Sequence, residues 1–187
     1  MRCVASSKLS CENRMRLFHV SDNPEIEIFN PRQVPSQPDS RLQGKVVWAV
    51  DEEHLPHYLL PRDCPRVCFA RNDTSSAQDV ARYLADPPQS RVIAVEWDWL
   101  ENIRAAELSV YEFPVETFKL IDTCAGYFIS QDSVVPLSVH HVSDAMAELR
   151  GYGVELRFMH DLWRLHDNVA SSSLDFSMIR MRNAKKR

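Results

Sequence analysis

Glycine is scarce in this 187-residue chain, which contains only four glycines, at positions 44, 126, 151 and 153. The phosphate loops of P-loop enzymes and of dinucleotide-binding Rossmann domains need closely spaced glycines, so neither motif is present. The G-x-S-x-G element of serine hydrolases is missing as well. These absences exclude the commonest nucleotide-binding and serine-hydrolase designs.

Long apolar runs and concentrated positive charge are also lacking. No apolar segment approaches the roughly 18 residues of a membrane span, and the start of the chain has no basic region followed by an apolar one. The net charge of −4 and the pI of about 6.0 lack the basic footprint of nucleic-acid-binding domains. We therefore expect neither a membrane nor a nucleic-acid partner, and the sequence indicates no particular protein partner.

Cysteine is present in an odd number, five, in a chain long enough to fold without disulfides. This usage predicts reduced thiols and a cytoplasmic location. Cys64 and Cys68 lie close together, but no second Cys or His pair follows at zinc-site spacing. His54 and His57 similarly lack a third ligand in the local sequence. We expect no metal site.

The composition, 44% hydrophobic and 26% charged, suits one domain with a single core. Residues 1–14 show no periodicity, which predicts a disordered extension or a translation start assigned too early. The globular domain is expected over residues 15–184. Residues 185–187 form a basic tail that we expect to be solvated and disordered.

Strand and helix patterns alternate irregularly along the domain, with strands in the majority. Strands are predicted at residues 16–20, 26–29, 46–50, 66–70, 91–96, 108–113, 118–121, 127–129, 134–139 and 154–159. Short helices are predicted near residues 51–60, 75–84, 97–103, 142–149 and 162–169. No regular βαβ period is evident, so we predict an α+β domain with a mixed or mainly antiparallel sheet.

Two residues with both polar and aromatic character are candidate ligand contacts. His19 ends the first predicted strand, where its imidazole can hydrogen-bond a ligand hydroxyl; the alternative is a satisfied core histidine. Tyr58 lies on a predicted helix, where its ring can stack on an aromatic ligand; the alternative is packing at the helix rim. Both alternatives remain open.

Arginines beside prolines are candidate anion contacts. Arg32 follows Pro31, Arg62 follows Pro61, and Arg66 follows Pro65. Arginine on a stiff turn suits a bidentate grip on phosphate or carboxylate, because its planar fork loses little freedom per bond. The alternative is that each pairs with a nearby acid such as Asp63.

Several separated blocks of the sequence resemble a known family when taken in order. These blocks are RLFHVSDNPEIEIFNPR, VVWAVDEEHLPHYLLPRDCPRV, AGYFISQDSVVPL, VELRFMHDLW and SLDFSMIRMRNA. Together they resemble a small, uncharacterised bacterial domain-of-unknown-function family over residues 15–184. This resemblance implies a bacterial origin but no assigned activity.

The order of the blocks also resembles the ADP-ribosyltransferase-like fold, in the branch with poly-ADP-ribose polymerases and RNA phosphotransferases. The resemblance implies that His19 contacts ribose hydroxyls, that Tyr58 stacks on the base, and that Arg32 or Arg62 meets phosphate. It therefore implies NAD or a related small nucleotide as the cofactor.

The catalytic part of that resemblance is incomplete. The glutamate that begins the third motif in such enzymes is replaced here by Gly126, and the glycine after the histidine is replaced by Val20. The nearby acids that can substitute are Asp122 and Asp132. Whether the chain is an enzyme is left open, with glycosidic transfer from NAD as one hypothesis.

The other hypothesis is a non-catalytic interaction or scaffold domain. It is motivated by the missing glutamate and by three tryptophans, Trp97, Trp99 and Trp163, which can mark a partner surface as well as a core.

Overall fold

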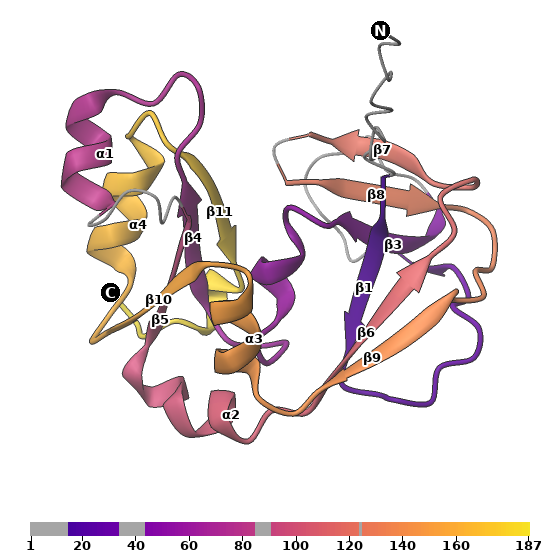
Figure 1. Ribbon diagram of the computed structural model, residues 1–187. Coiled ribbons are helices and arrows are strands. Elements are labelled where there is room, and N and C mark those ends of the chain that lie inside the picture. The colour runs from indigo at the N-terminus through magenta and orange to yellow at the C-terminus, as the bar shows by residue number, and fades with distance from the viewer. Residues whose placement is uncertain (1–14, 34–43, 85–90, 124) are drawn as a thin grey trace, which may run out of the picture.

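Two β-sheets form the framework of the molecule (Figure 1). The computed structural model describes residues 15–33, 44–84, 91–123 and 125–187. Among the strand pairs of these residues, only β5 with β10 is parallel. The prediction of an α+β domain with mainly antiparallel strands is confirmed, although the strands are divided between two sheets.

The larger sheet has the strand order β7-β8-β3-β1-β6-β9, and β2 also pairs with β3. Its strands are β1 (Leu17–Ser21), β2 (Arg32–Gln33), β3 (Lys45–Asp51), β6 (Leu108–Phe113), β7 (Lys119–Asp122), β8 (Tyr127–Ser130) and β9 (Ser138–Val142). Because successive side chains point to opposite faces, Phe18 and Val50 enter one core cluster and Leu17 and Val47 enter another. Apolar residues therefore cover both faces of the sheet's centre.

The smaller sheet has the strand order β10-β5-β4-β11. Its strands are β4 (Arg66–Ala70), β5 (Arg91–Glu96), β10 (Val154–Met159) and β11 (Asp175–Ile179). The apolar run in β5 is fully buried from Val92 to Val95. Such a run is typical of a strand that is covered on both faces.

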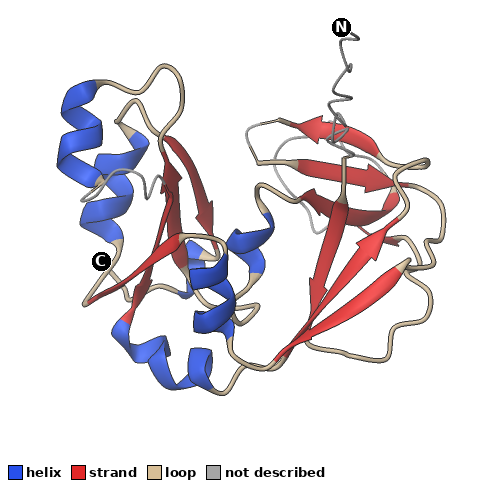
Figure 2. Cartoon of the chain, in the orientation of Figure 1, coloured by secondary structure: helices blue, strands red, loops and turns tan. Residues whose placement is uncertain are grey.

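Short helices cover the smaller sheet (Figure 2). They are α1 (Ala77–Tyr83), α2 (Leu100–Arg104), α3 (Ala145–Gly151) and α4 (Trp163–Ala170), with the 3-10 turns η1 (Leu55–Tyr58), η2 (Trp97–Trp99) and η3 (Met181–Asn183). α1 and α4 lie on the face away from the larger sheet, whereas η1 and α3 lie between the sheets (Figure 1). No helix in the described part of the chain is long and apolar enough to cross a membrane.

The starts of α1 and α3 follow local capping chemistry, two and three residues later than predicted. The Ser76 hydroxyl accepts the Asp79 amide at 3.1 Å and begins α1. The Asp144 carboxylate accepts the Ala147 amide at 2.9 Å and begins α3. In each case the side-chain oxygen satisfies a backbone N–H group that has no partner within the helix.

Three strand predictions need correction. Residues 26–29 do not form a strand; only Phe29 pairs, in an isolated bridge with Val134. The strand predicted over residues 134–139 begins at Ser138. β11 was not predicted, because its polar and apolar residues follow neither a clear alternation nor a continuous apolar run. Its pairing with β4 is a tertiary contact that a local pattern does not show.

The basic end of the chain packs against the smaller sheet. The backbone N–H of Lys185 donates to both carboxylate oxygens of buried Glu96, at 3.0 and 3.2 Å. The Trp163 indole N–H donates to the Lys185 carbonyl, and the Arg187 guanidinium lies 4.5 Å from the centroid of the same Trp163 ring. Lys185 and Arg187 of the predicted basic tail thus make contacts with Glu96 and Trp163, although the Arg187 side chain is 60% exposed. The predicted extension over residues 1–14 lies outside the described residues.

Candidate functional site

β1 and β3 separate at the centre of the larger sheet (Figure 1). β1 pairs with β3 at only two positions, Leu17 with Asp51 and Phe18 with Val50. All five residues of β1, in contrast, pair with β6. Beyond Phe18, β1 therefore follows β6, and its next residue, His19, lies where the two strands part.

The His19 side chain bridges the separating strands. Its Nδ1 lies 2.8 Å from the carbonyl oxygen of Trp48 on β3. Because a carbonyl oxygen can only accept, Nδ1 carries the ring proton, and Nε2 is left as an acceptor. The ring packs edge-on to Phe29 with centroids 5.0 Å apart, and it stacks on Phe113 at 6.0 Å.

Burial is the largest cause of a lowered pKa at His19, and the positive charges of Arg62 and Arg32 lower it further. The bond to the Trp48 carbonyl acts in the opposite direction, but the net shift is downward. His19 is therefore a neutral imidazole at physiological pH, with Nε2 as an acceptor nitrogen, and the charges of two arginines act on the ring. Within the described residues, no hydrogen bond is made by Nε2.

Arg32 and Arg62, whose charges act on His19, come from two different segments. Arg32 pairs with Val46 at the start of β3, and Arg62 lies in the turn between η1 and β4. Both side chains are exposed, and neither forms an ion pair with any described carboxylate. The alternative that Arg62 pairs with Asp63 does not apply, because Asp63 lies 4.0 Å from Arg180 instead.

Tyr58 ends η1 and makes contacts of its own. Its hydroxyl donates to the Tyr127 hydroxyl on β8, and the Arg66 guanidinium lies 6.0 Å from its ring centroid. Burial is the largest cause of the raised pKa of Tyr58, and the neighbouring Tyr127 adds to it. Tyr127 also contacts the Trp48 ring at 5.6 Å, so Trp48 and Tyr127 lie between Tyr58 and His19 in the chain of contacts.

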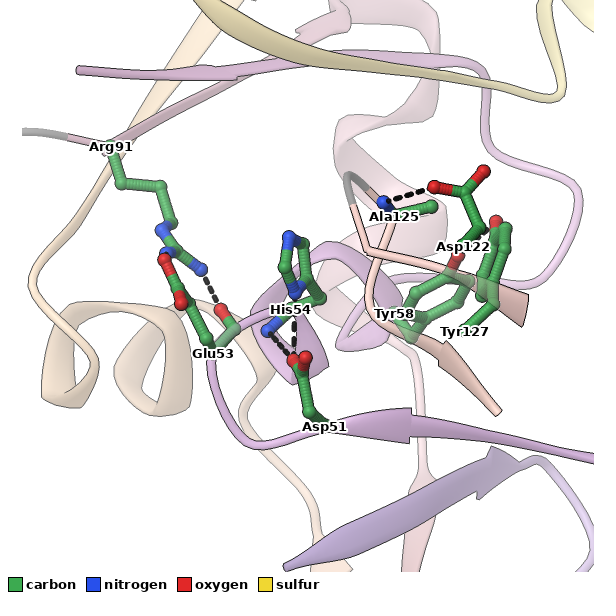
Figure 3. Close-up of polar contacts among 8 residues, drawn as sticks. All are labelled: Asp51, Glu53, His54, Tyr58, Arg91, Asp122, Ala125 and Tyr127. Atoms are coloured by element: carbon green, nitrogen blue, oxygen red, sulfur yellow. Dashed lines mark hydrogen bonds and ion pairs between the residues drawn. The ribbon is translucent and has the colours of Figure 1, made fainter. Parts of the chain in front are cut away.

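Asp51 and His54 form a second polar group where β3 leads into η1 (Figure 3). The Asp51 carboxylate accepts the His54 backbone N–H at 2.9 Å and the His54 ring Nδ1 at 2.7 Å. Burial alone would raise the pKa of Asp51, but these hydrogen bonds and the charges of His54 and Arg91 lower it overall. Both hydrogen bonds to the Asp51 carboxylate thus come from one residue, His54, just before η1.

Gly126 faces this Asp51 carboxylate. A Cβ atom added at Gly126 would lie 2.6 and 2.7 Å from the two Asp51 carboxylate oxygens, and it would also meet the His54 ring. The backbone at Gly126 has φ of 61°, and its carbonyl accepts the Asp51 N–H at 3.1 Å. The position that corresponds to the missing glutamate is therefore too close to an existing acid to carry a side chain.

The two acids named as substitutes lie at opposite ends of β8. The Asp122 carboxylate accepts the Ala125 N–H at 3.1 Å in the turn before β8, close to Tyr58 and Tyr127 (Figure 3). Asp132 follows the other end of β8, where its N–H donates to the Ser130 hydroxyl at 3.1 Å. Of the two, Asp122 is the one near the Tyr58 and Tyr127 pair.

The cysteines and histidines of the described residues do not gather into a metal-binding group. No cluster of three or more His, Cys, Asp or Glu side chains occurs there. Cys64 and Cys68 are buried free thiols, and burial raises the pKa of each to about 12. Both thiols are therefore protonated at neutral pH.

The fold and this polar region define an α+β domain in which a buried histidine, acted on by the charges of two arginines, lies where two strands of a sheet separate. The model of a family of unknown function (DUF6886) matches residues 18–184, and the chain belongs to this family. The predicted resemblance to a family of unknown function is thus confirmed over nearly the range expected. Among the curated proteins and the solved structures, no significant match is found.

Proposed function

We propose that the domain is a cytoplasmic nucleotide-binding protein with an ADP-ribosyltransferase-like arrangement, and that NAD or a related nucleotide binds beside His19. The observation that carries the proposal is the neutral His19 imidazole, which bonds the Trp48 carbonyl through Nδ1 and whose pKa the charges of Arg32 and Arg62 lower. An acceptor nitrogen in the field of two guanidinium groups that form no ion pair suits a ligand that offers both a hydroxyl donor and an anion.

A nucleotide supplies both of these groups. A ribose hydroxyl donates to Nε2 of His19, and the phosphates accept from Arg32 and Arg62. Two exposed guanidinium groups without carboxylate partners lose little free energy in water. An anion that binds both of them adds favourable interactions. The aromatic surface for a base comes from Trp48 and from the pair Tyr58 and Tyr127.

The proposal is limited to binding. A transfer reaction of the ADP-ribosyl type needs a free carboxylate near the ribose. Position 126 is glycine, and the Asp51 carboxylate that faces it already accepts two hydrogen bonds from His54. These features favour a domain that recognises a nucleotide over one that cleaves it.

The test is the shift of the thermal unfolding midpoint with NAD, ADP-ribose or AMP. A ligand at 100 times its dissociation constant adds about 2.7 kcal/mol to stability, which is an easily measured shift. His19→Ala should abolish the shift. His140→Ala is the matched control, because His140 is an exposed histidine on β9. No shift with any of the three ligands would rule out the proposal.

A second candidate function is a non-catalytic interaction domain, which the exposed apolar residues beside the edge strand β9 favour. Val135 is 61% exposed and Leu137 is 66% exposed, and Val139 on β9 continues the same alternation. An exposed apolar edge strand is a site where another chain can pair. Of the three tryptophans, only Trp97 supports this function, because it is 54% exposed, whereas Trp99 packs against the core and Trp163 donates to the Lys185 carbonyl.

A concentration series in analytical ultracentrifugation, compared with Leu137→Lys, tests this second function. Self-association or partner binding that Leu137→Lys abolishes would support it. Unchanged assembly in the variant would contradict it.

A further inference from the structure

Three arginine side chains gather at the turn of residues 61–63, between η1 and β4. Arg66 donates from Nη1 to the Pro61 carbonyl at 3.2 Å. Arg180 donates from Nε to the Arg62 carbonyl at 3.2 Å. Arg62 itself extends from the turn as an exposed side chain. The turn therefore carries the Arg62 guanidinium itself, and the guanidinium groups of Arg66 and Arg180 each bind one of two successive backbone carbonyls of the turn.

Arg66 carries a buried charge without an acidic partner. Only 2% of the residue is exposed, and its Nε has no hydrogen-bond partner. No ion pair joins it to a described carboxylate. Its other neighbours are the Tyr58 ring and the two protonated thiols Cys64 and Cys68. A buried charge without a counter-ion is costly in a folded protein, so this arrangement calls for an anion.

Arg180 has a strained backbone at the same place. Its φ is 55°, and it is the one non-glycine residue with a positive φ in the described part of the chain. Such conformations cost energy and persist where surrounding contacts hold them, often at functional sites. Here the holding contacts include the bond from Asn183 to the Asp63 carbonyl at 2.8 Å, one residue along the same turn.

The carboxylates near these arginines are few. Asp63 lies 4.0 Å from Arg180, and its side chain is 65% exposed. Buried Glu96 is occupied by the backbone N–H of Lys185. The turn of residues 61–63 therefore has a local excess of positive charge, although the chain as a whole has a net charge of −4.

We propose that Arg62, Arg66 and Arg180 form a binding site for a phosphoryl group. Arg62 and Arg180 are accessible from solvent, and Arg66 supplies the charge behind them. The phosphoryl group comes either from free phosphate or from a nucleotide. Only the nucleotide as its source rests on the proposed function. Several guanidinium forks around one phosphoryl group give short, charge-assisted hydrogen bonds.

The test is titration with inorganic phosphate alone, followed by calorimetry and by the thermal midpoint, in wild type and in Arg180→Gly. Glycine accepts the positive φ without strain, so the variant should keep its fold and a midpoint close to that of wild type. Its phosphate affinity should fall at least about tenfold, because one charge-assisted bond is lost. Arg182→Ala is the matched control, since it removes one exposed positive charge from η3 and should leave the affinity unchanged.

The outcomes separate this site from the proposed function. Phosphate binding that is weakened by Arg180→Gly but not by Arg182→Ala supports the site, even if NAD and ADP-ribose do not bind. Absence of phosphate binding in wild type, or equal weakening in both variants, overturns it. Nucleotide binding that depends on His19 but not on Arg180 would leave the proposed function standing without this site.

Discussion

Gly126 lies so close to Asp51 that the Asp51 carboxylate occupies the space that a side chain at position 126 would need. A Cβ at Gly126 would lie 2.6 Å from Asp51 Oδ2, and both residues also share the backbone bond from Asp51 N–H to the Gly126 carbonyl. The contact fixes the β7 to β8 turn against the start of η1. The acid that faces position 126 therefore comes from β3.

Gly126→Ala should destabilise the domain more than Gly153→Ala. Both glycines have a positive φ, 61° and 68°, so alanine costs roughly 1 to 2 kcal/mol at either site. Only Gly126 has neighbours within contact distance, and overpacking there adds about 1 to 3 kcal/mol. Urea unfolding of both variants measures the difference. Equal losses of stability would show that Asp51 and His54 move away at little cost.

Stability should fall as the pH drops below the ordinary histidine range, because of His57. Burial is the main cause that lowers its pKa from 6.5 to about 3. The unfolded chain binds a proton as the pH falls through 6.5, whereas the folded chain does so only near 3. The contribution of His57 is thus fully present above 6.5 and is lost between about 6.5 and 3, at up to about 1.4 kcal/mol per pH unit.

NMR titration of the His57 ring protons measures this pKa directly. The pH dependence of urea unfolding in His57→Leu should be shallower than in wild type by about one proton over the same range. A His57 pKa near 6.5 in the folded protein would contradict the account.

Cys64 and Cys68 should resist alkylation in the folded protein. Burial raises the pKa of each thiol to about 12, so the reactive thiolate is scarce at mildly alkaline pH. Peptide mass spectrometry after a brief iodoacetamide pulse should find both unmodified in buffer and modified in urea. Fast native labelling of either residue would show that this part of the core opens readily.

Removal of residues 185–187 should destabilise the domain by about 1 to 3 kcal/mol, because buried Glu96 loses its backbone N–H donor. Removal of residues 186–187 alone keeps the Lys185 N–H and is the matched control. It should cost much less. Equal effects of the two truncations would show that the Arg187 contact with Trp163, rather than Glu96, accounts for the loss.

Much of the fold could be predicted from local patterns. The apolar run of residues 91–96 and the alternating pattern of residues 108–113 indicate strands regardless of their partners, and both strands were confirmed. The division into two sheets was not predictable, because it depends on which strands pair. The separation of β1 from β3 also depends on pairing. Phe18 and His19 lie in one predicted strand, and the sequence does not show that only Phe18 pairs with β3.

The sequence indicated which types of residue form the site better than it indicated which contacts they make. Prolines next to Arg32 and Arg62 indicated stiff turns, and the structure brings the charges of both arginines to His19. Arg66 was predicted as an anion contact, but its burial without an acidic partner was not, because its sequence neighbours do not show which side chains pack around it. The sequence did not indicate that Arg180 contacts the turn of residues 61–63, because the two segments are far apart along the chain.

The central claim is that His19 is a neutral imidazole whose Nε2 accepts a hydrogen bond from a nucleotide. Long-range proton–nitrogen NMR of the histidine rings, recorded with and without ADP-ribose, tests it most directly. The account predicts a free protein with the proton on Nδ1 at neutral pH, and an Nε2 resonance that shifts as ligand is added. A proton on Nε2, a charged ring, or no change of the His19 resonances at saturating ligand would contradict it.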